Sequence, residues 1–431
     1  MTERPIAYRL DADNRFVVED YNWATPFANF FPGIAGLWGI PLWIYTVSRH
    51  QAVCSLGVRD KDHQILEFQS FNRACQAVRH EGFRTFLRLD SGPVLEPFLR
   101  SEREAVSQRL ILSAGELELH EEDRDAGLAI QVVYHPLVNL PVAGLARRLT
   151  IRNQGAAPRR LECLDGVARL LPYGVNQDHV KFTARHIEAM MGVRFHAGVP
   201  LFRLKQSAAD DERIAKLSGG NFYLALQDDL LGKDQLVVDP EVLFGDPFQH
   251  LHPWSFARAG LAGVLSAEQQ LDNRTPCAFA AFETTLEPGA EITLYSVIGN
   301  GATDRQVSQF VTLVQQPGAL EQQRQDNRQV LSQITERALT VSSDKRFDAY
   351  CGQDFLDNVM RGGMPLALSN EPNRRVFYVH SRQNGDLERD YHYFVLEPTY
   401  LSQGTGHYRS IFQNRRTDPW FFPEVEDANI V

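Results

Sequence analysis

Hydrophobic and polar residues alternate along much of the chain between residues 80 and 300, and a period of two predicts β-strands. Glu116–His120 alternates and runs into an acidic turn, and Leu128–Tyr134 is its expected hairpin partner. After the turn residues Asn153-Gln154-Gly155, we expect Leu161–Leu171 to return beside Leu145–Arg152. Many short strands separated by turns predict a large antiparallel β-sandwich. Further strands are expected at Gly82–Leu89, Phe222–Leu226, Ala278–Thr285 and Ile292–Ile298.

The hydrophobic period changes to a helical one near Asp304, where Val307, Phe310, Val311 and Val314 share one face. Pro317-Gly318 ends this helix, and a Gln-rich second helix is predicted over Ala319–Leu339. A helix pair that is polar on most sides is typical of a linker between domains. An amphipathic helix follows over Phe347–Met360. The stretch His179–Leu217 is predicted to be helical or irregular.

These patterns divide the chain into four parts. The expected parts are an aromatic, Gly/Pro-rich segment that packs on the sandwich (1–75), the β-sandwich domain (76–302), a helical linker (303–341) and a helical C-terminal region (342–431).

The segment Phe30–Val47 is almost free of charge and is barely long enough to cross a bilayer. Its prolines and glycines favour a buried, irregular segment, so no membrane helix is predicted. Trp23, Trp38 and Trp43 cluster in this region, and aromatics on a Gly/Pro frame are either core residues or a ligand platform.

Composition excludes several classes of protein. The 431 residues carry a formal net charge of -10, which disfavours a general nucleic-acid binder. The five cysteines are widely spaced and odd in number, so free thiols in a reducing cytoplasm are predicted, and no disulfide framework or zinc ribbon. The N-terminus lacks the pattern of a secretory signal. The expected location is therefore cytoplasmic.

Nucleotide-binding glycine motifs and a Gly-x-Ser-x-Gly elbow are absent from the sequence. His250-x-His252, with Asp246 nearby, is most simply a pair of loop histidines. No metal and no cofactor are therefore predicted.

The stretch His380–Arg416 carries the densest polar chemistry in the chain. It combines carboxylates, arginines, amides and tyrosines, and this combination suits a polyhydroxylated ligand, because aromatic faces cover a sugar ring while amides and guanidinium groups bind its hydroxyls. A polar loop with weak surface ion pairs is the alternative interpretation. Asp386, Glu388 and Asp390 alternate, so on a strand they would share one face. Groups on one face do not straddle a glycosidic bond, which favours contacts with sugar hydroxyls or with Arg389 over acid/base roles.

Three segments resemble the 1,2-β-oligoglucan phosphorylases, which are related to cellobiose phosphorylase. They are Phe31-Pro32-Gly33-Ile34-Ala35-Gly36-Leu37-Trp38-Gly39-Ile40-Pro41-Leu42-Trp43, Gln383-Asn384-Gly385-Asp386-Leu387-Glu388-Arg389-Asp390-Tyr391, and the run from Ser402-Gln403-Gly404-Thr405-Gly406-His407-Tyr408-Arg409 to Gln413-Asn414-Arg415-Arg416. The resemblance spans nearly the whole chain, as the N-terminal part of a longer family member.

The resemblance implies a β-sandwich, a helical linker and the beginning of an (α/α)6 barrel, as a multidomain β + α protein. It also implies inverting phosphorolysis of β-1,2-linked glucooligosaccharides, with inorganic phosphate as co-substrate and α-glucose 1-phosphate as product. In such a reaction an Asp protonates the glycosidic oxygen while phosphate attacks from the opposite side.

The family pattern transfers to individual residues. Arg409 matches the Arg of the loop that holds the terminal glucose, and Gln413 matches its Gln. Ser410 stands where an Asp is usual, and Asn414 agrees with the oligoglucan branch. By this resemblance the expected substrate-binding residues are Arg409, Gln413, Asn414, Arg415, Asp386 and Asp390.

Twelve barrel helices need on the order of 200 residues, whereas about ninety follow Ser342. We therefore expect the general-acid Asp and the phosphate site beyond Val431, and an inactive chain when it is alone. Its expected partners are the oligosaccharide, phosphate, and a homodimer mate or a complementary C-terminal half. The alternatives are a non-catalytic carbohydrate-binding or assembly module and a β-1,2-glucan hydrolase that uses Asp386 or Glu388.

Overall fold

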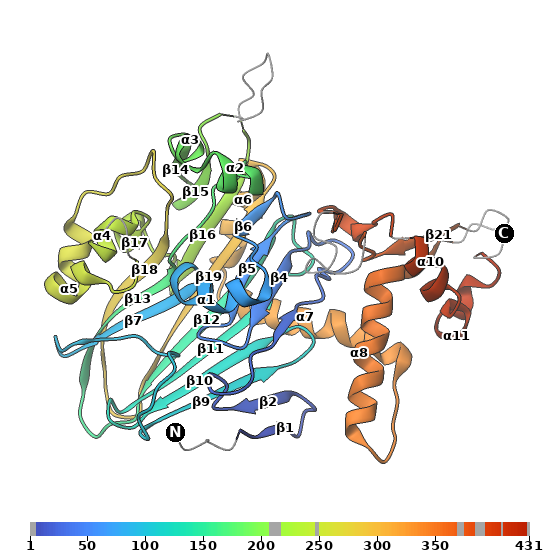
Figure 1. Cartoon of the computed structure of the whole chain (residues 1–431), viewed down its shortest axis with the longest axis horizontal. Helices are drawn as coiled ribbons and strands as arrows, with labels where there is room; N and C mark the ends of the chain where they lie inside the picture. The colour runs from blue at the N-terminus through green and yellow to red at the C-terminus, as the bar shows by residue number, and fades with distance from the viewer. Residues whose placement is uncertain are drawn as a thin grey trace.

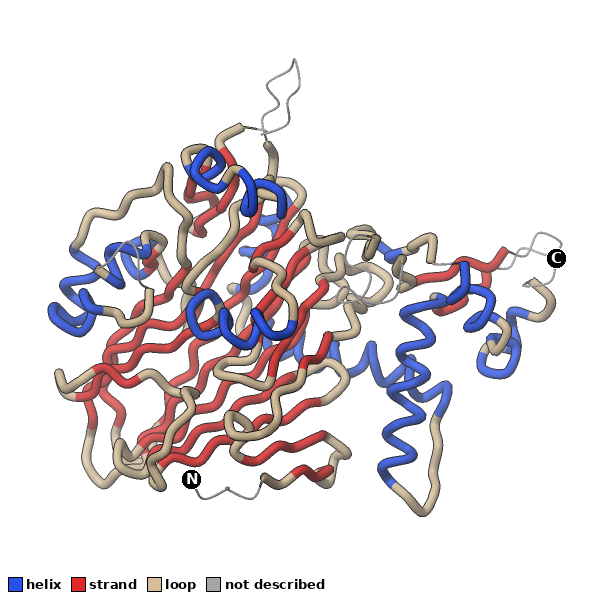
Figure 2. The backbone as a smooth tube through the Cα atoms, in the orientation of Figure 1, coloured by secondary structure: helices blue, strands red, loops and turns tan. Residues whose placement is uncertain are grey.

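The computed structural model describes residues 6–206, 217–245, 250–368, 375–383, 393–406 and 408–428. The chain forms a large β-sandwich with helices on its outer faces, and helix α7 connects it to a smaller C-terminal layer (Figure 1). The sandwich strands run roughly alongside one another through the body of the molecule (Figure 2). The predicted sheet-rich architecture with large antiparallel sheets is confirmed.

The larger layer is a ten-stranded sheet in which neighbouring strands are antiparallel. The predicted hairpin is present, with Leu117 opposite Tyr134. In spatial order the strands are β1 Tyr8–Leu10, β2 Phe16–Glu19, β9 Val106–Leu112, β10 Leu117–Asp123, β11 Leu128–Pro136, β12 Ala143–Asn153, β19 Glu291–Gly301, β16 Gly220–Leu226, β15 Val199–Leu204 and β14 Met191–His196.

The facing layer is a five-stranded sheet, and the main hydrophobic core lies between the two layers, with Leu145 and Leu149 of the large sheet in the same cluster as Leu87 and Cys163. Burial of these alternate side chains is what drives the two sheets together. In spatial order the strands are β17 Leu236–Val237, β18 Ala278–Leu286, β13 Arg159–Val167, β7 Phe83–Leu89 and β8 Val94–Leu95.

The expectation that Leu161–Leu171 returns beside Leu145–Arg152 is wrong, because β13 pairs with β18 and β7 in the opposite layer. Both edges of β12 are occupied, by β11 and β19. The Asn153 side chain donates to the carbonyl oxygens of Ala157 (2.8 Å) and Leu286 (2.9 Å), and these bonds support the crossing of the chain between layers.

The N-terminal segment contributes a third, four-stranded sheet of β3 Ala28–Phe30, β4 Trp43–Val47, β5 Val53–Gly57 and β6 Gln64–Leu66. Helix α1 (Phe71–Glu81) packs on it through Ala74 and Val78. The segment Phe30–Val47 was predicted to be buried and irregular. Residues 31–42 have no regular structure and are mostly buried, as predicted, but Trp43–Val47 forms strand β4.

The stretch predicted as helical or irregular begins with helices α2 (Gln177–Phe182) and α3 (Ala184–Glu188), but it then forms the hairpin β14–β15. Ala197 and Gly198 both have positive φ angles at its turn, which suits the twist of a tight hairpin. Helices α4 (Pro240–Phe244) and α5 (Trp254–Ser266) cover the outer face of the five-stranded sheet.

The two predicted linker helices are present as α6 (Asp304–Val314) and α7 (Ala319–Thr335). Helix α6 covers the outer face of the ten-stranded sheet through Val307, Phe310 and Val314. Helix α7 carries the chain onto α8 (Lys345–Gly362), whose Phe355 and Leu356 share a core with Leu331 and Ile334 of α7.

Beyond α8 lie short elements, and the beginning of an (α/α)6 barrel stays a prediction, as do the domain boundaries. The elements are β20 Met364–Leu368, β21 Arg375–Val379, the 3-10 turn Tyr400–Ser402, α10 Tyr408–Arg415, α11 Asp418–Phe421 and the 3-10 turn Pro423–Val425.

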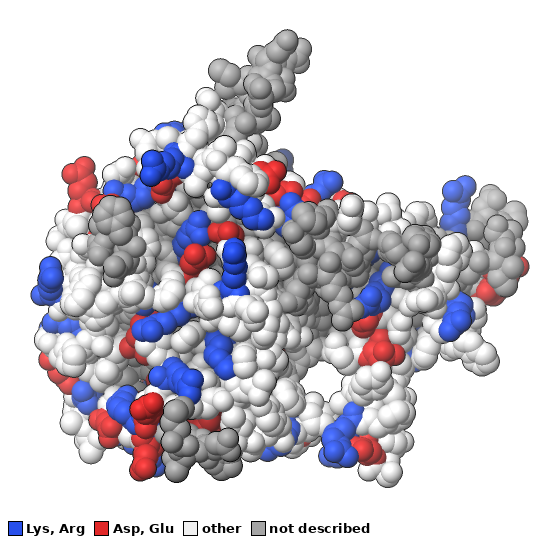
Figure 3. All heavy atoms as spheres, viewed as in Figure 1, with Lys and Arg blue, Asp and Glu red and all other residues white. Residues whose placement is uncertain are grey.

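Among the helices that the structure describes, none is both long and apolar enough to cross a membrane. The five cysteines, all of which lie within the described residues, form no disulfide bond with one another. On the face drawn in Figure 3, cationic and anionic side chains are interspersed, and the residues visible there form no basic stripe.

Candidate functional site

The loop around Trp38 lies beside residues 400–401, which are far away in sequence and directly precede the Ser402–Arg416 motif. The backbone N–H of Leu401 donates to the carbonyl oxygen of Leu37 at 2.8 Å. The rings of Trp38 and Tyr400 meet edge to face, with centroids 6.1 Å apart. The apolar loop around Trp38 and the C-terminal motif region therefore form one local structure.

The Trp38 loop borders a cavity of ≈ 540 Å³, which we call the Trp38 cleft. Its walls are the Gly36–Trp38 loop, the C-terminal end of α7 with the 3-10 turn Glu336–Ala338, and His380 after β21. A volume of this size is typical of small-ligand sites. Polar groups that border the cleft are Asn139, Gln333, Glu336 and Arg337.

Trp38 supplies the aromatic surface of the cleft, since its side chain is 62% exposed. The other two tryptophans of the predicted cluster do not join it. Trp43 is buried and donates to the carbonyl oxygen of Asp60 at 3.1 Å. Trp23 lies under the guanidinium group of Arg100 at 3.7 Å. The platform interpretation therefore applies to Trp38 alone.

Glycine is required where the Trp38 loop turns. Gly36 has a φ of +73°, and a Cβ there would lie 2.3 Å from Oδ1 of Asn139. That oxygen accepts a hydrogen bond from the backbone N–H of Trp38 at 3.3 Å, and Asn139 donates through its own backbone N–H to the carbonyl oxygen of Ala35 at 2.7 Å. The close approach of Asn139 thus places Trp38 at the cleft.

His380 is almost completely buried beside the cleft, with a φ of +62°. Its backbone N–H donates to Leu401 O at 2.9 Å, but its Nδ1 atom has no hydrogen-bond partner among the described residues. Burial lowers the pKa of His380 to about 4, so the imidazole is neutral at pH 7.

Arg337 is anchored by residues near the C-terminal end of the described chain. Its guanidinium group lies 3.8 Å from the carboxylate of Glu424 and 5.2 Å from the ring centroid of Phe422. About half of its side chain remains exposed. A half-exposed, planar cation at the rim can bind hydroxyl groups of a ligand. Sequence reasoning missed Arg337 and Gln333, because both lie in a stretch predicted as a polar linker helix.

Gln413, Asn414 and Arg415 share helix α10, which packs against the end of α8. Arg415 Nε donates to Gly362 O at 3.0 Å, and its guanidinium carbon lies 3.5 Å from the ring centroid of Tyr378. Burial lowers the pKa of Arg415. These contacts favour a role for Arg415 in holding α10, whereas Gln413 is exposed.

The other predicted binding residues are only partly covered by the structure. Arg409 is the second residue of α10, but its side chain lies outside the described part, and Asp386 and Asp390 lie outside it entirely. Their sugar-binding roles stay predictions.

Within the described ranges, no group of three or more His, Cys, Asp and Glu side chains is arranged to hold a metal ion. His250 stacks on Phe244 at 4.8 Å, and His252 meets Trp254 at 4.4 Å. Both imidazoles therefore contact aromatic rings.

No family model and no curated protein match the sequence. Solved structures with similarity include a bacterial glucoamylase complexed with acarbose (7% identity, TM-score 0.40, covering 80% of this chain and 44% of that chain). The family GH92 α-mannosidase from Bacteroides thetaiotaomicron matches at 10% identity with a TM-score of 0.35, covering 81% and 43%. A putative kojibiose phosphorylase from human microbiome matches at 11% identity with a TM-score of 0.28, covering 79% and 32%.

The chain thus spans less than half the length of each of these three proteins. Their names are those of carbohydrate-active enzymes. At these identities and TM-scores the similarity assigns the chain to no family, and it carries no argument about what the chain binds.

Proposed function

We propose that this chain is the sugar-recognising part of an inverting glycoside phosphorylase that acts on β-1,2-linked glucooligosaccharides. The observation that carries the proposal is that the Trp38 loop, which borders the cleft, also contacts the residues that lead into the C-terminal motif. The Trp38 loop carries part of the resemblance to the 1,2-β-oligoglucan phosphorylases. Tyr400 and Leu401, which contact this loop, directly precede the Ser402–Arg416 motif that carries another part.

The chemistry of the cleft suits an uncharged sugar. The exposed indole of Trp38 offers a flat apolar face for one glucose ring, and Gln333 and Arg337 offer donors for its hydroxyl groups. Arg409, Gln413 and Asn414 are proposed to hold the terminal glucose, with Asp386 and Asp390 accepting hydroxyl hydrogens. In the complete reaction phosphate would attack the anomeric carbon, and α-glucose 1-phosphate would leave.

Binding of sophorotriose, measured by isothermal titration calorimetry, tests the recognition step. We expect Trp38→Ala to weaken binding about tenfold, because removal of a stacked aromatic ring costs on the order of 1 kcal/mol or more. Trp254→Ala is the matched control, since it removes another partly exposed indole from the outer face of the sandwich. Equal binding of sophorotriose by the wild type and Trp38→Ala would falsify the proposed role of the cleft.

Turnover is tested by incubating the chain with sophorotriose and inorganic phosphate. We expect binding without release of glucose 1-phosphate, because no general acid is assigned among these residues. Release of glucose 1-phosphate would show that the catalytic Asp lies within the chain. Release of reducing sugar without phosphate would favour the hydrolase alternative, and Asp386→Asn would then show whether that carboxylate takes part.

A further inference from the structure

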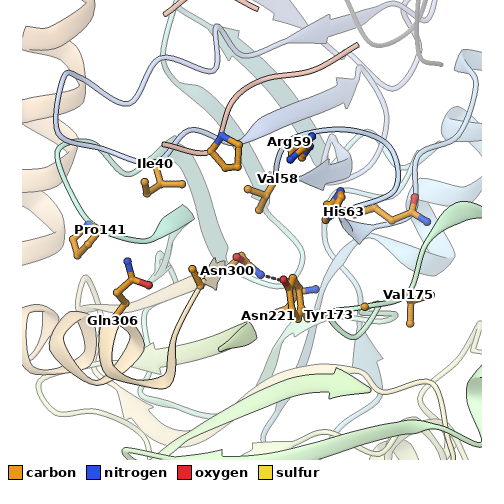
Figure 4. Close-up of a pocket in the computed structure, with 14 residues that line it drawn as sticks. Ile40, Val58, Arg59, His63, Pro141, Tyr173, Val175, Asn221, Asn300 and Gln306 are labelled. Atoms are coloured by element: carbon orange, nitrogen blue, oxygen red, sulfur yellow. Dashed lines mark hydrogen bonds between the residues drawn. The ribbon is translucent and has the colours of Figure 1, made fainter. Parts of the chain in front are cut away.

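A second, smaller cavity of ≈ 250 Å³ lies away from the motif residues (Figure 4). It is bordered by the ends of strands β16 and β19, the beginning of α6, the loop that joins β5 to β6, and Pro398. In Figure 4, Gln306 approaches from helix α6, and a dashed line joins the hydrogen-bonded pair Asn221 and Asn300. We call this cavity the amide pocket.

Two asparagines on adjacent strands form one wall of the pocket. Asn221 is 2% exposed, and its Nδ2 donates to Leu171 O at 2.8 Å. Its Oδ1 accepts from Asn300 Nδ2, also at 2.8 Å, and the two residues are opposite each other in the β16–β19 register. Asn221 is thereby locked, and it orients the Asn300 carboxamide, which has further donor and acceptor capacity for a ligand.

Gln64 is a buried polar side chain whose amide group lacks one hydrogen bond that a ligand could supply. It is 1% exposed and borders the pocket. Its Oε1 accepts from the backbone N–H of Phe68 at 2.9 Å, but its Nε2 has no partner among the residues that the structure describes. A buried donor without an acceptor is unfavourable, so a hydroxyl oxygen delivered here would gain a hydrogen bond that the protein alone does not make.

Two basic side chains, Arg59 and His63, border the pocket, and the carboxylate of Asp60 lies beside both. His63 Nδ1 lies 2.6 Å from Asp60 Oδ1, and Arg59 Nε lies 3.4 Å from Asp60 Oδ2. Burial raises the pKa of Asp60, but the hydrogen bond and charge interaction with His63, the backbone N–H of Asp62 and the charge of Arg59 together outweigh this effect, and the pKa lies below its ordinary value. Asp60 is therefore ionised and offsets the positive charge that would otherwise attract an anion.

The remaining walls are uncharged. Ile40, Val58 and Val175 supply apolar contacts, and Tyr173 supplies an aromatic ring. Among the described residues that border the pocket there is no Asp or Glu, so it lacks the carboxylate pair that cleavage of a glycosidic bond requires.

We propose that the amide pocket binds one neutral hexose unit, without catalysis, as a site separate from the Trp38 cleft. Amides present donors and acceptors together, which matches the hydroxyl groups of a sugar, and the apolar walls match its ring faces. The cavity is smaller than the ~300–1,000 Å³ of typical drug-sized sites, so it suits a single ring. The ligand is either a free monosaccharide or the end unit of an oligosaccharide.

Saturation-transfer NMR on the whole chain with methyl β-D-glucoside, methyl β-D-galactoside and sophorotriose tests the proposal. The measurement is made in the Trp38→Ala background, in which binding at the cleft is weakened. There we expect at least one of these sugars to bind and Ala302→Trp to abolish that signal, because Ala302 is exposed at the pocket and a large side chain there fills it. Gln306→Met keeps the side-chain length but removes the amide, and we expect it to weaken binding about fivefold. Signal from a monosaccharide identifies a free sugar, and signal from sophorotriose alone identifies a chain end.

Trp38→Ala separates this proposal from the proposed function, because it alters the cleft and leaves the residues of the amide pocket unchanged. Loss of binding of all three sugars in Trp38→Ala overturns the pocket proposal, and so does sugar binding that the double variant Trp38→Ala with Ala302→Trp retains. Binding of inorganic phosphate in place of the sugars also overturns it. Thermal unfolding of each variant shows that the fold is retained.

Discussion

Arg147 and Asp165, on facing sheets of the sandwich, are among the most deeply buried charges of the described residues. Their side chains are 1% and 0% exposed, and they form an ion pair inside the core. Gln51 accepts from Arg147 at 2.6 Å, and Thr85 donates to Asp165 at 2.6 Å. A charge in such a position is tolerated only because these partners are in place.

Removing one charge of the Arg147–Asp165 pair should therefore lower the free energy of unfolding more than removing both charges. We expect Arg147→Met to lower the free energy of unfolding by about 3–5 kcal/mol, because Asp165 is left buried without its counter-ion. The double variant Arg147→Met with Asp165→Asn should recover much of this loss. Urea unfolding of the wild type, both single variants and the double variant measures the coupling, and strictly additive effects would argue against it.

Glu121 should make stability depend on pH. Burial raises the pKa of this carboxyl to about 7, against the opposing hydrogen bonds from Gln108 and from the backbone N–H of Phe98. The folded protein therefore keeps a proton that the unfolded chain releases near its ordinary pKa of 4.5. The contribution of this group to stability is full below pH 4.5, declines between about 4.5 and 7, and is level above.

The decline attributable to Glu121 should amount to about 3 kcal/mol, and Glu121→Gln should remove it. Urea unfolding at several pH values between 4 and 8 compares the two slopes. An identical slope in the variant would assign the pH dependence to other groups.

At the scale of elements, helix α7 is attached to the sandwich by charge as well as by apolar packing. Glu116, at the β9–β10 turn, is 3% exposed and lies between Arg324 (3.0 Å) and Arg328 (2.6 Å) of the helix. Burial raises the pKa of Glu116, but the hydrogen bonds from Arg328 and Arg324 prevail and hold it below its ordinary value. The attachment should weaken only as pH falls below that ordinary range.

We expect Glu116→Ala to destabilise the docking of α7 by about 2–4 kcal/mol, because two arginines lose a buried acceptor. Hydrogen exchange should then increase in α7 and α8 while the sandwich strands stay protected. Glu321→Ala is the control, since its pair with Arg148 is more exposed. Increased exchange across the whole sandwich would contradict a local effect.

Some of the secondary-structure elements could be predicted from the sequence, and others could not. Strands with clean alternation, such as β10 and β11, were predictable because one face is buried in the core. The hairpin β14–β15 was not predicted, because its turn requires Ala197 to have a positive φ angle, which residues other than glycine rarely adopt. The sheet to which β13 belongs was also out of reach, because alternation identifies a buried face and not the neighbouring strand.

At the scale of the whole molecule, the apolar loop over residues 31–42 could be predicted as buried, but its partner could not. Its contact with Leu401 joins positions more than 360 residues apart, and no local pattern encodes such a pairing. The exposure of Trp38 among neighbours that are buried likewise depends on Asn139, which belongs to the sandwich. The amide pocket was not predicted, because Asn221, Asn300 and Gln64 come from separate strands and show no shared spacing.

The two cavities have a common partition. Three short segments reach both cavities. In the first, Trp38 borders the cleft and Ile40 borders the amide pocket, and in the second, Asn139 borders the cleft and Pro141 borders the pocket. In the third, Tyr400 contacts Trp38 and Pro398 borders the pocket. Segments of two or three residues thus separate one ligand from the other.

Such a partition makes the two sites candidates for allosteric coupling. If a hexose in the amide pocket changes the affinity of the cleft for an oligosaccharide by some factor, the oligosaccharide must change the affinity of the pocket by the same factor, because the cycle of binding free energies closes. Titrations in both orders would give two measurements of one quantity. If binding at one site leaves the affinity of the other unchanged, the factor is one, and the two sites bind their ligands independently.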